Sequence, residues 1–193
     1  MEKRNPVRTL PESLCYVCVD VETSGPNPAD YSLLSIGACL VEDISTKFYI
    51  ELRPVSSKYV AAALAVCHLS LDELSRTGVS PKQAMAQFEG WLGDVVPRNK
   101  RPVFVAFNAV FDWMFVNDYF FRYLGRNPFG HSALDMKSYF MGVAGVPWNK
   151  TSLQQVIERY HTEHILTHNA LQDALDQAEL FLRIVAEQNA HIA

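Results

Sequence analysis

The sequence predicts an α/β domain in which a mixed sheet is covered by helices. Two observations support this fold class. Three apolar, β-branched segments come first, and a further apolar strand then alternates with segments of helical periodicity up to the C-terminus. Strands followed by alternating strand and helix are typical of a mixed sheet with helices packed on its faces.

The first three elements are predicted strands. Residues 15–21 and 33–41 are apolar and rich in β-branched side chains, and the turn-forming stretch 24–30 separates them. Residues 48–52 alternate between apolar and polar side chains and stop just before Pro54. The chain therefore opens with three successive strands, of which the first two are joined by a polar loop.

The later elements are mainly helices. Residues 103–107 form an apolar strand, a second, short strand ends near Leu134, and Asp135 is placed to cap a helix or to support a nearby site. The predicted helices cover residues 59–66, 71–74, 80–95, 109–124, 153–159 and 170–187.

The composition fits a globular protein of one domain. The 193 residues are 49% hydrophobic and 20% charged, far from the profile of a disordered chain. No apolar run approaches the ~20 residues that cross a bilayer, and residues 1–12 contain no apolar stretch typical of a signal peptide. We expect an extended N-terminal lead over residues 1–12, a single domain over residues 13–193, no membrane partner and a cytoplasmic location.

The four cysteines agree with a reducing compartment. Their spacing is too irregular for a disulfide framework in a chain of this size. Cys15 and Cys18 have the spacing of a CxxC pair, but no second pair or suitably spaced histidine accompanies them. We interpret them as buried thiols of a strand.

Two acidic side chains lie at the end of the first predicted strand. Asp20 and Glu22 are two residues apart, so a strand projects both carboxylates to the same face. Like charges held close together repel one another unless a cation lies between them. The pair alone is weak support for a site, because a D-x-E by chance is about what this composition predicts.

Two further acids are expected near helix N-termini. Asn108 is predicted to be an N-cap, which places Asp112 in the first helical turn. Asn169 and Gln172 have the spacing of a capping box, and Asp173 again follows its asparagine by four residues. Because side chains lean toward the N-terminus of a helix, both aspartates can point to the edge of the sheet where the first strand ends.

Four converging carboxylates predict a metal site. An oxygen-rich set without cysteine ligands suits hard cations, Mg²⁺ with Mn²⁺ as a substitute, rather than zinc. Two such ions can activate a water and stabilise the leaving oxygen in a displacement at phosphorus. His168 precedes the last helix, and an ordinary histidine pKa of ~6.5 suits a general base.

These residues resemble a known family. The ordered pattern is Asp20-x-Glu22-Thr23-x-Gly25, then Asn108-x-x-x-Asp112, then His168-x-Ala170-x-x-Asp173-Ala174. It is similar to the three motifs of the DEDDh 3′–5′ exonuclease superfamily, which has a ribonuclease H-like fold. The ribonuclease T branch looks most similar, through residues 126–129 and 134–135.

The resemblance implies a fold, an activity and a role for each site residue. The fold would be a central mixed sheet whose first three strands are antiparallel, and the activity would release nucleoside 5′-monophosphates from single-stranded 3′ ends of RNA or DNA. Of two Mg²⁺ ions, one would be held by Asp20, Glu22 and Asp173, and the other by Asp20 and, through water, Asp112. His168 would be the general base. The expected substrate-binding residues are Thr23, Ser24, Gly25, Asn108 and Phe111.

The sequence departs from the ribonuclease T branch where that branch places aromatic wedges around the substrate end. Pro26 and Val66 stand at two such positions, whereas Phe111 matches a third and Phe129 lies in the segment of a fourth. Stacking on an aromatic side chain contributes ~1–3 kcal/mol per base. The preferred substrate end therefore does not transfer from that branch.

Two other functions stay open. An oligoribonuclease-like enzyme would degrade very short oligonucleotides, and a non-catalytic nucleic-acid-binding module would keep the fold without the chemistry. The many aromatic side chains of helix 109–124 would support a homodimer, which the sequence does not establish.

The net charge does not exclude a nucleic-acid substrate. The chain has 17 basic and 21 acidic side chains, a formal charge of −4. Without the four proposed metal ligands, 17 acids would face 17 bases. The acidic excess is therefore equal to the proposed site, and bound divalent ions would offset it.

Overall fold

This computed structural model describes residues 10–162 and 167–192, so most of the expected lead over residues 1–12 lies outside the described residues. The strands are β1 (Leu14–Thr23), β2 (Leu33–Leu40), β3 (Lys47–Glu51), β4 (Arg101–Ala106) and β5 (Ala133–Asp135). The helices are α1 (Ala61–Cys67), α2 (Leu71–Thr77), α3 (Pro81–Val95), α4 (Val110–Leu124), α5 (Met136–Ala144), the 3₁₀ helix η1 (Trp148–Lys150), α6 (Leu153–Tyr160) and α7 (Ala170–Ile192).

The strands form one mixed sheet in the order β3-β2-β1-β4-β5. The pairs β1–β2 and β2–β3 are antiparallel, and β4 and β5 add parallel to β1. The predicted mixed sheet with three antiparallel strands at its start is confirmed. The central strand of the sheet is therefore β1, the strand that carries Asp20 and Glu22.

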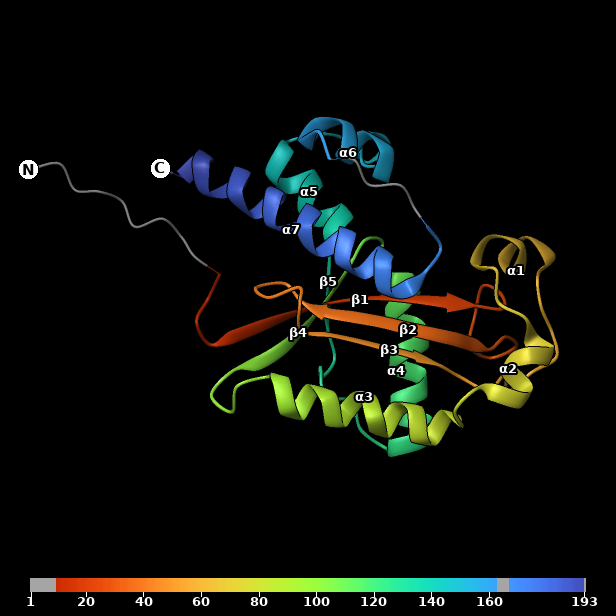
Figure 1. Cartoon of the computed structure of the whole chain (residues 1–193). Coiled ribbons are helices and arrows are strands. Elements are labelled where there is room, and N and C mark those ends of the chain that lie inside the picture. Colours follow the sequence, from red (N-terminus) through yellow and green to blue (C-terminus); the bar gives the residue numbers. More distant parts are fainter. Residues whose placement is uncertain (1–9, 163–166, 193) are drawn as a thin grey trace, which may run out of the picture.

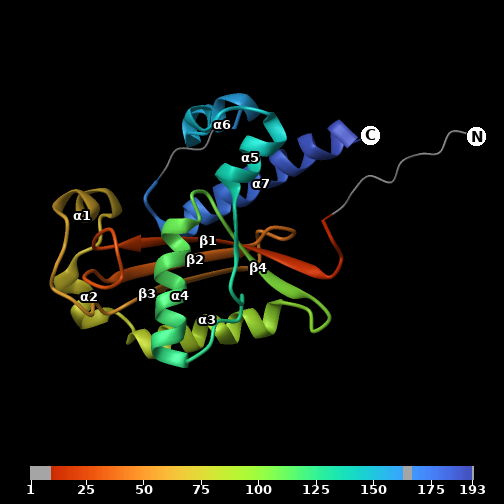
Figure 2. The same cartoon turned by 180° about the vertical axis from the view of Figure 1, so that it is seen from behind.

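Helices cover both faces of this sheet (Figures 1 and 2). The C-terminal helices α5, α6 and α7 lie over one face, whereas α3 and α4 lie over the other. The short helices α1 and α2 lie at one end of the sheet. The molecule has three layers, as the α/β prediction requires.

Side chains of β1 alternate between two cores. Val17 and Val19 are fully buried against α3 and α4, whereas Cys18 is fully buried on the face that α7 covers. Asp20 and Glu22 continue the row of Cys18 because successive strand residues point to opposite faces. The acidic pair therefore ends a buried row and faces α7.

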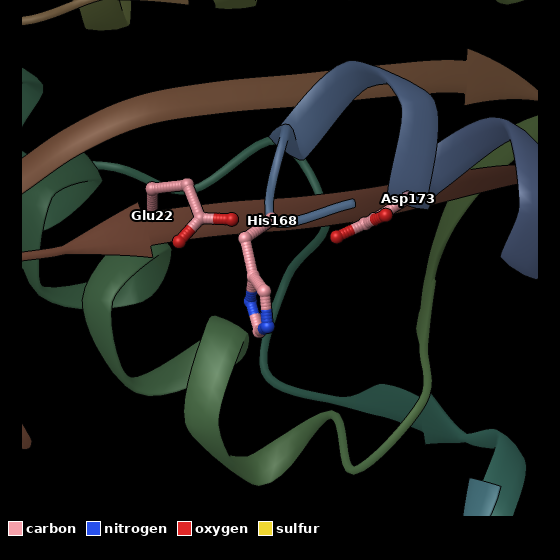
Figure 3. Close-up of side chains that lie close together, drawn as sticks. All are labelled: Glu22, His168 and Asp173. Carbon is pink, nitrogen blue, oxygen red and sulfur yellow. The ribbon is translucent and has the colours of Figure 1, made fainter. Parts of the chain in front are cut away.

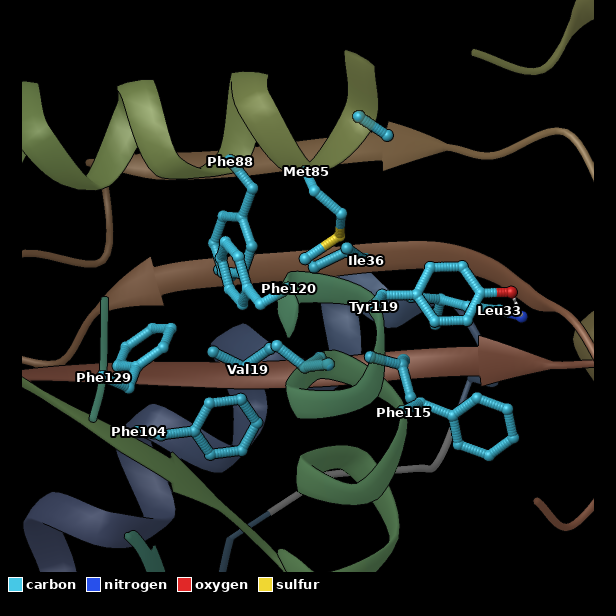
Figure 4. Close-up of a cluster of buried hydrophobic side chains, with 14 of the residues drawn as sticks. Val19, Leu33, Ile36, Met85, Phe88, Phe104, Phe115, Tyr119, Phe120 and Phe129 are labelled. Atoms are coloured by element: carbon cyan, nitrogen blue, oxygen red, sulfur yellow. Dashed lines mark hydrogen bonds between the residues drawn. The ribbon is translucent and has the colours of Figure 1, made fainter. Parts of the chain in front are cut away.

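An aromatic cluster fills the space between the sheet and helices α3 and α4 (Figure 4). Phe88 of α3 stacks on Phe120 of α4 with 5.7 Å between ring centroids. Phe129 is 7% exposed and packs edge-on against Phe104 at 5.3 Å. The Phe129 side chain is thus part of the core and does not reach a substrate end as a wedge.

The boundaries differ from the prediction in a few places. Helix α7 continues past the predicted end at residue 187 to Ile192, and α5 was anticipated only as a helix capped by Asp135. The side chain of Asp135 does accept the backbone N–H of Ser138 at 2.7 Å.

Among the described residues, no helix is both long and apolar enough to cross a membrane. All four cysteines are free and buried.

Candidate active site

The first two acids are held at the end of β1. In the register with β2, Asp20 lies opposite Gly37 and Glu22 lies opposite Ser35. Both carboxylates are partly buried on the face of the sheet that α7 covers. The predicted convergence of this pair on one face is therefore present.

Gly37 lets α7 approach these acids closely. A Cβ atom at Gly37 would lie 2.1 Å from the carbonyl carbon of Ala170 and 2.2 Å from the backbone nitrogen of Leu171. Such separations are far below van der Waals contact, so another residue at this position would displace the first turn of α7. The missing side chain on β2 thus lets the N-terminus of α7 rest directly on the sheet beside Asp20.

The first turn of α7 and the loop before it bring Asp173 and His168 close to Glu22. Donor atoms of Glu22, His168 and Asp173 all lie within 4.8 Å of one another, and Figure 3 shows the side chain of His168 starting between the two acids, with its ring directed to one side of them. The Asp173 carboxylate accepts hydrogen bonds from the backbone N–H and the hydroxyl of Thr167, each at 2.9 Å. These bonds connect the loop that carries His168 to the first turns of α7.

The predicted cap of α7 is partly correct. The side chain of Asn169 accepts the backbone N–H of Gln172 at 3.1 Å, as an N-cap does. The side chain of Gln172, however, donates to Asp176 at 2.7 Å, so it is directed along the helix and not back toward Asn169. The sequence spacing identified the capping residue but not the partner of the glutamine.

Asp112 comes from the opposite layer and reaches the strand backbone. It lies in the first turn of α4, as predicted, and its carboxylate accepts the N–H of Val21 at 3.1 Å. Val21 lies between the two acids of β1, so this bond places the Asp112 carboxylate beside both. Four acids from β1, α4 and α7 therefore meet at one end of the central strand.

The prediction that Asn108 caps α4 is wrong. Asn108 has a φ of 61°, a left-handed conformation that asparagine tolerates better than most residues, and its side chain is exposed. The helix follows Ala109, whose backbone N–H donates to Asp135 at 2.8 Å. The sharp turn after β4 needs a residue with positive φ, and this need displaces the cap by one residue.

Burial and mutual repulsion disfavour the charged forms of the site acids. Desolvation, followed by the negative charges of Asp112, Glu22 and Asp173, raises the pKa of Asp20 well above its ordinary value. Burial, and then the charge of Asp173, raises the pKa of Glu22 to about 7. The pKa of Asp112 is raised mainly by burial, although hydrogen bonds from backbone N–H groups oppose the shift. The cluster is unfavourable at neutral pH unless positive charge enters it.

The donor set fits divalent ions. It consists of carboxylate oxygens from three elements and the nitrogens of one imidazole, and no cysteine belongs to it. Such a set suits Mg²⁺ or Mn²⁺ better than a soft metal. A bound cation would favour the ionised carboxylates and offset the repulsion that, after burial, helps to raise these pKa values.

The loop after Glu22 is held by internal hydrogen bonds. Ser24 is fully buried, and its hydroxyl donates to the carbonyl of Lys58 and accepts the N–H of Ser32. The Thr23 hydroxyl donates to the carbonyl of Gly25 at 2.9 Å, and a Cβ atom at Gly25 would collide with the ring of Tyr31. These bonds fix the shape of the loop beside Glu22, and its expected contact with substrate stays a prediction.

Two of the four wedge positions hold aliphatic side chains. Pro26 is exposed and Val66 of α1 is 42% exposed. Phe111 is half-buried and packs against Phe115, with 5.5 Å between ring centroids. Its expected role as a substrate platform stays a prediction.

Sequence reasoning missed two residues of this site. Gln177 lies one turn after Asp173 and donates from Nε2 to the Asp20 carboxylate at 2.7 Å, and Gly37 allows the close approach of α7. A glycine inside an apolar strand is a recognised signal of close backbone approach, so Gly37 could have been found. Gln177 carries no such signal, because its partners are distant in the sequence.

The fold and the site together define an α/β protein with a carboxylate-rich site that fits divalent ions, and comparisons with known proteins identify its class. A family model described as exonuclease, RNase_T, matches residues 17–181. The chain is 48% identical over 166 residues to the 3′–5′ DNA exonuclease Cap18 of Escherichia coli, covering 86% of this chain and 89% of that protein.

Solved structures agree on the fold. The nuclease domain of 3′hExo, a DEDDh family member bound to rAMP, superposes with a TM-score of 0.73 at 14% identity and covers 89% of this chain and 92% of that one. E. coli exonuclease I in complex with a dT13 oligonucleotide gives a TM-score of 0.69 at 17% identity, covering 93% of this chain and 42% of that one.

The chain belongs to this exonuclease family, within the DEDDh superfamily. It is a 3′–5′ exonuclease, a hydrolase that acts on nucleic acid, and its acidic site fits divalent metal. The predicted superfamily and ribonuclease H-like fold are therefore confirmed.

Proposed function

We propose that this exonuclease removes nucleoside 5′-monophosphates from single-stranded 3′ ends of DNA, with Mg²⁺ as its natural ion and Mn²⁺ as a substitute. The observation that carries the proposal is the meeting of Glu22, His168 and Asp173, with donor atoms within 4.8 Å of one another, beside Asp20. The choice of DNA rests on the 48% identical relative, which is named as a DNA exonuclease.

Each acid has its own part in the proposal. Asp20, Glu22 and Asp173 would hold one ion, and Asp20 and Asp112 would hold the second, with water between Asp112 and the ion. Bound there, the ions would favour ionisation of a water and neutralise charge on the phosphate and on the departing oxygen. The raised pKa values of Asp20 and Glu22 support the proposal, because a bound cation would favour their ionised forms at neutral pH.

His168 would act as the general base. Its imidazole lies beside Glu22 and Asp173, on the loop whose Thr167 binds the Asp173 carboxylate. A water between these groups would lose a proton to a ring nitrogen while its oxygen forms a bond to the terminal phosphorus. The bond from phosphorus to the 3′ oxygen breaks, and that oxygen takes a proton from solvent, which leaves a shortened strand and a nucleoside 5′-monophosphate.

Substrate contacts are proposed for the rim of the site. Thr23 and Gly25 would contact the terminal nucleotide through their backbone, because the hydroxyl of Thr23 already bonds within the loop. Asn108, with its exposed side chain, and Phe111 would contact the sugar and base from the start of α4. Ser24 would fix the shape of the loop and would not contact the substrate through its hydroxyl, because that hydroxyl already bonds to the backbone of Lys58 and Ser32.

The experiment is a product ladder on 5′-labelled strands. DNA and RNA of the same sequence, either single-stranded or as a duplex with a 3′ tail, are incubated with Mg²⁺, Mn²⁺ or a chelator. We expect stepwise shortening from the 3′ end, faster on single-stranded DNA than on RNA, and no products in chelator. Preference for RNA would contradict the proposed substrate, and metal-independent cleavage would contradict the proposed site.

The Asp20→Ala variant is the matched control for this experiment. It should lose about a thousandfold or more of the rate at saturating Mg²⁺ because both proposed ions share this carboxylate. In chelator, its circular dichroism melt should stay close to that of the unchanged protein, because the removed repulsion offsets the lost hydrogen bond from Gln177. Retained hydrolysis would overturn the assignment of Asp20.

The two alternatives are tested alongside. Faster hydrolysis of a dinucleotide than of a longer tailed strand would favour an oligoribonuclease-like enzyme. Binding of DNA without any hydrolysis in Mn²⁺ would favour a non-catalytic module. Neither has a specific structural observation in its favour.

Three organisational expectations also stay proposals. We propose that residues 13–193 act as one exonuclease domain after the lead, and that the protein works in the cytoplasm. A homodimer has weaker support than the sequence suggested, because Phe115, Tyr119 and Phe120 of α4 are buried in the chain's own core and Phe121 is 43% exposed. Sedimentation velocity measures this directly.

A further inference from the structure

Gln177 makes two hydrogen bonds at the base of the site. Its Nε2 donates to the Asp20 carboxylate at 2.7 Å, and its Oε1 accepts the backbone N–H of Phe107 at 2.8 Å. The residue is 6% exposed, so neither bond competes freely with water. It lies four residues after Asp173 on α7, on the same face of the helix.

The chemistry of the two partners fixes the orientation of the amide. The N–H of Phe107 can only donate, so it requires the carbonyl oxygen of Gln177. The amide nitrogen must then face Asp20, where an ionised carboxylate can only accept. The ionised form of Asp20 therefore has a donor aimed at one of its two oxygens, which leaves the other oxygen and the remaining lone pairs for a ligand.

These bonds join the three segments that supply the acids. Asp20 is on β1, Phe107 follows β4 at the turn that leads to Asp112, and Gln177 itself belongs to the helix of Asp173. The hydrogen bond to Asp20 spans 157 residues of sequence. A rotation of the Gln177 side chain would break contacts to two of the three segments at once.

We propose that Gln177 is a positioning residue for the exonuclease reaction, which fixes the Asp20 carboxylate in the orientation that binds the divalent ions. The proposal rests on the metal site proposed above. Residues that orient the ligands of a metal commonly change metal affinity or activity by 10- to 100-fold when they are replaced. Gln177 would act through Asp20 and would not touch the substrate.

A purely structural role makes a different prediction. If Gln177 only satisfied the buried N–H of Phe107, a variant that keeps this acceptor would keep full activity. Gln177→Glu has nearly the same shape and retains an oxygen for Phe107, but it cannot donate to an ionised Asp20 when it is itself ionised. Gln177→Met fills similar space and removes both hydrogen bonds.

The chain offers a matched control on the same helix. Gln188 lies eleven residues further along α7 and accepts a hydrogen bond from the hydroxyl of Tyr139, away from the acids. Gln188→Met therefore removes a glutamine hydrogen bond from α7 without affecting Asp20. Its hydrolysis rate and Mn²⁺ affinity should match those of the unchanged protein.

The experiment measures Mn²⁺ binding and steady-state hydrolysis for the four proteins. Free Mn²⁺ is followed by electron paramagnetic resonance without substrate, and kcat and KM are measured on a single-stranded DNA. For Gln177→Met we expect a Mn²⁺ dissociation constant about 10-fold or more above that of the unchanged protein, kcat lower by about 10- to 100-fold and KM within about threefold. Gln177→Glu should also lose kcat by about 10-fold or more at alkaline pH, where the introduced carboxyl group is ionised and cannot donate to Asp20.

Two results would overturn the role of Gln177. One is a folded Gln177→Met variant whose Mn²⁺ affinity and kcat stay within twofold of the unchanged protein. The other, which decides the question if the methionine variant does not fold, is full kcat in Gln177→Glu at alkaline pH, where the introduced carboxyl group is ionised and cannot donate to Asp20. If the unchanged protein bound Mn²⁺ but hydrolysed no DNA, the proposed function would be wrong, and the Mn²⁺ affinity of Gln177→Met would still decide the proposed orientation of Asp20.

Discussion

Glu22 shows how one buried acid connects the metal site to the stability of the protein. Burial, and then the charge of Asp173, raises the pKa of Glu22 from an ordinary 4.5 to about 7. A group whose pKa is higher in the folded state binds its proton more tightly there than in the unfolded chain. It therefore stabilises the fold fully below pH 4.5, and this contribution is lost as the pH rises toward 7.

The metal-free protein should accordingly become less stable between pH 5 and pH 8. In chelator, we expect the free energy of unfolding to fall by about 2 to 3 kcal/mol through Glu22 over this range. The Glu22→Gln variant, which cannot ionise, should lose that part of the decline. The measurement is urea unfolding at a series of pH values in chelator. An equal slope in Glu22→Gln and the unchanged protein would show that Glu22 is not the group responsible.

Residue-level prediction from the sequence succeeded where the signal was local. Asn169 was identified as a cap because its partner, the N–H of Gln172, is three residues away. Asn108 has the same favourable residue type, but the turn after β4 requires a positive φ there, a demand set by how the strand meets the helix. Gln177 could not be found, because the hydrogen bond that defines its role crosses most of the chain.

At the scale of elements, the contact between β2 and α7 decides whether the site assembles. The Gly37→Ala variant would place a methyl group about 2 Å from the backbone of Ala170. The first turn of α7 must then move away from the sheet, and Asp173 and His168 move with it. We expect a loss of stability of about 1 to 3 kcal/mol and a loss of activity beyond what the unfolded fraction explains.

A second glycine provides the control for this prediction. Gly90 lies inside α3, and a Cβ atom there meets nothing within 4 Å. The Gly90→Ala variant should gain about 0.5 to 1 kcal/mol of stability, because alanine favours the helix, with activity unchanged. Thermal melts and initial rates of both variants suffice. Normal activity in Gly37→Ala would mean that the site tolerates a shift of α7.

At the scale of the whole molecule, the sequence predicted the helices and strands better than it predicted which of them lie side by side. Alternating and helical periodicity placed the strands and most helices, because these patterns record which side chains are buried. The antiparallel pairing of the first three strands came only from family resemblance, and the order β3-β2-β1-β4-β5 was not predicted, since pairing joins segments far apart in the chain. The aromatic side chains of α4 suggested an interface between subunits. In the structure, however, Phe115, Tyr119 and Phe120 pack into the hydrophobic core between α4 and the sheet.

The charge of the whole molecule leads to a last prediction about DNA binding. The formal charge of −4 equals the four acids of the site, so the rest of the chain is balanced at 17 acids and 17 bases. A phosphate entering the metal-free site meets carboxylates, and no general basic excess attracts it from elsewhere. The site should therefore bind a DNA 3′ end well only when divalent ions reverse its charge.

The His168→Ala variant allows this dependence to be measured without cleavage, because it keeps all four acids and lacks the proposed base. Fluorescence anisotropy of a labelled single-stranded DNA should show binding at least about 10-fold tighter in Mg²⁺ than in chelator. Adding Glu22→Gln to this variant should strengthen binding in chelator above pH 7, since it removes a carboxylate that is ionised there. Equal affinity with and without Mg²⁺ would mean that the strand binds outside the acidic site, at a local surface whose positive charge is hidden in the overall balance of acids and bases.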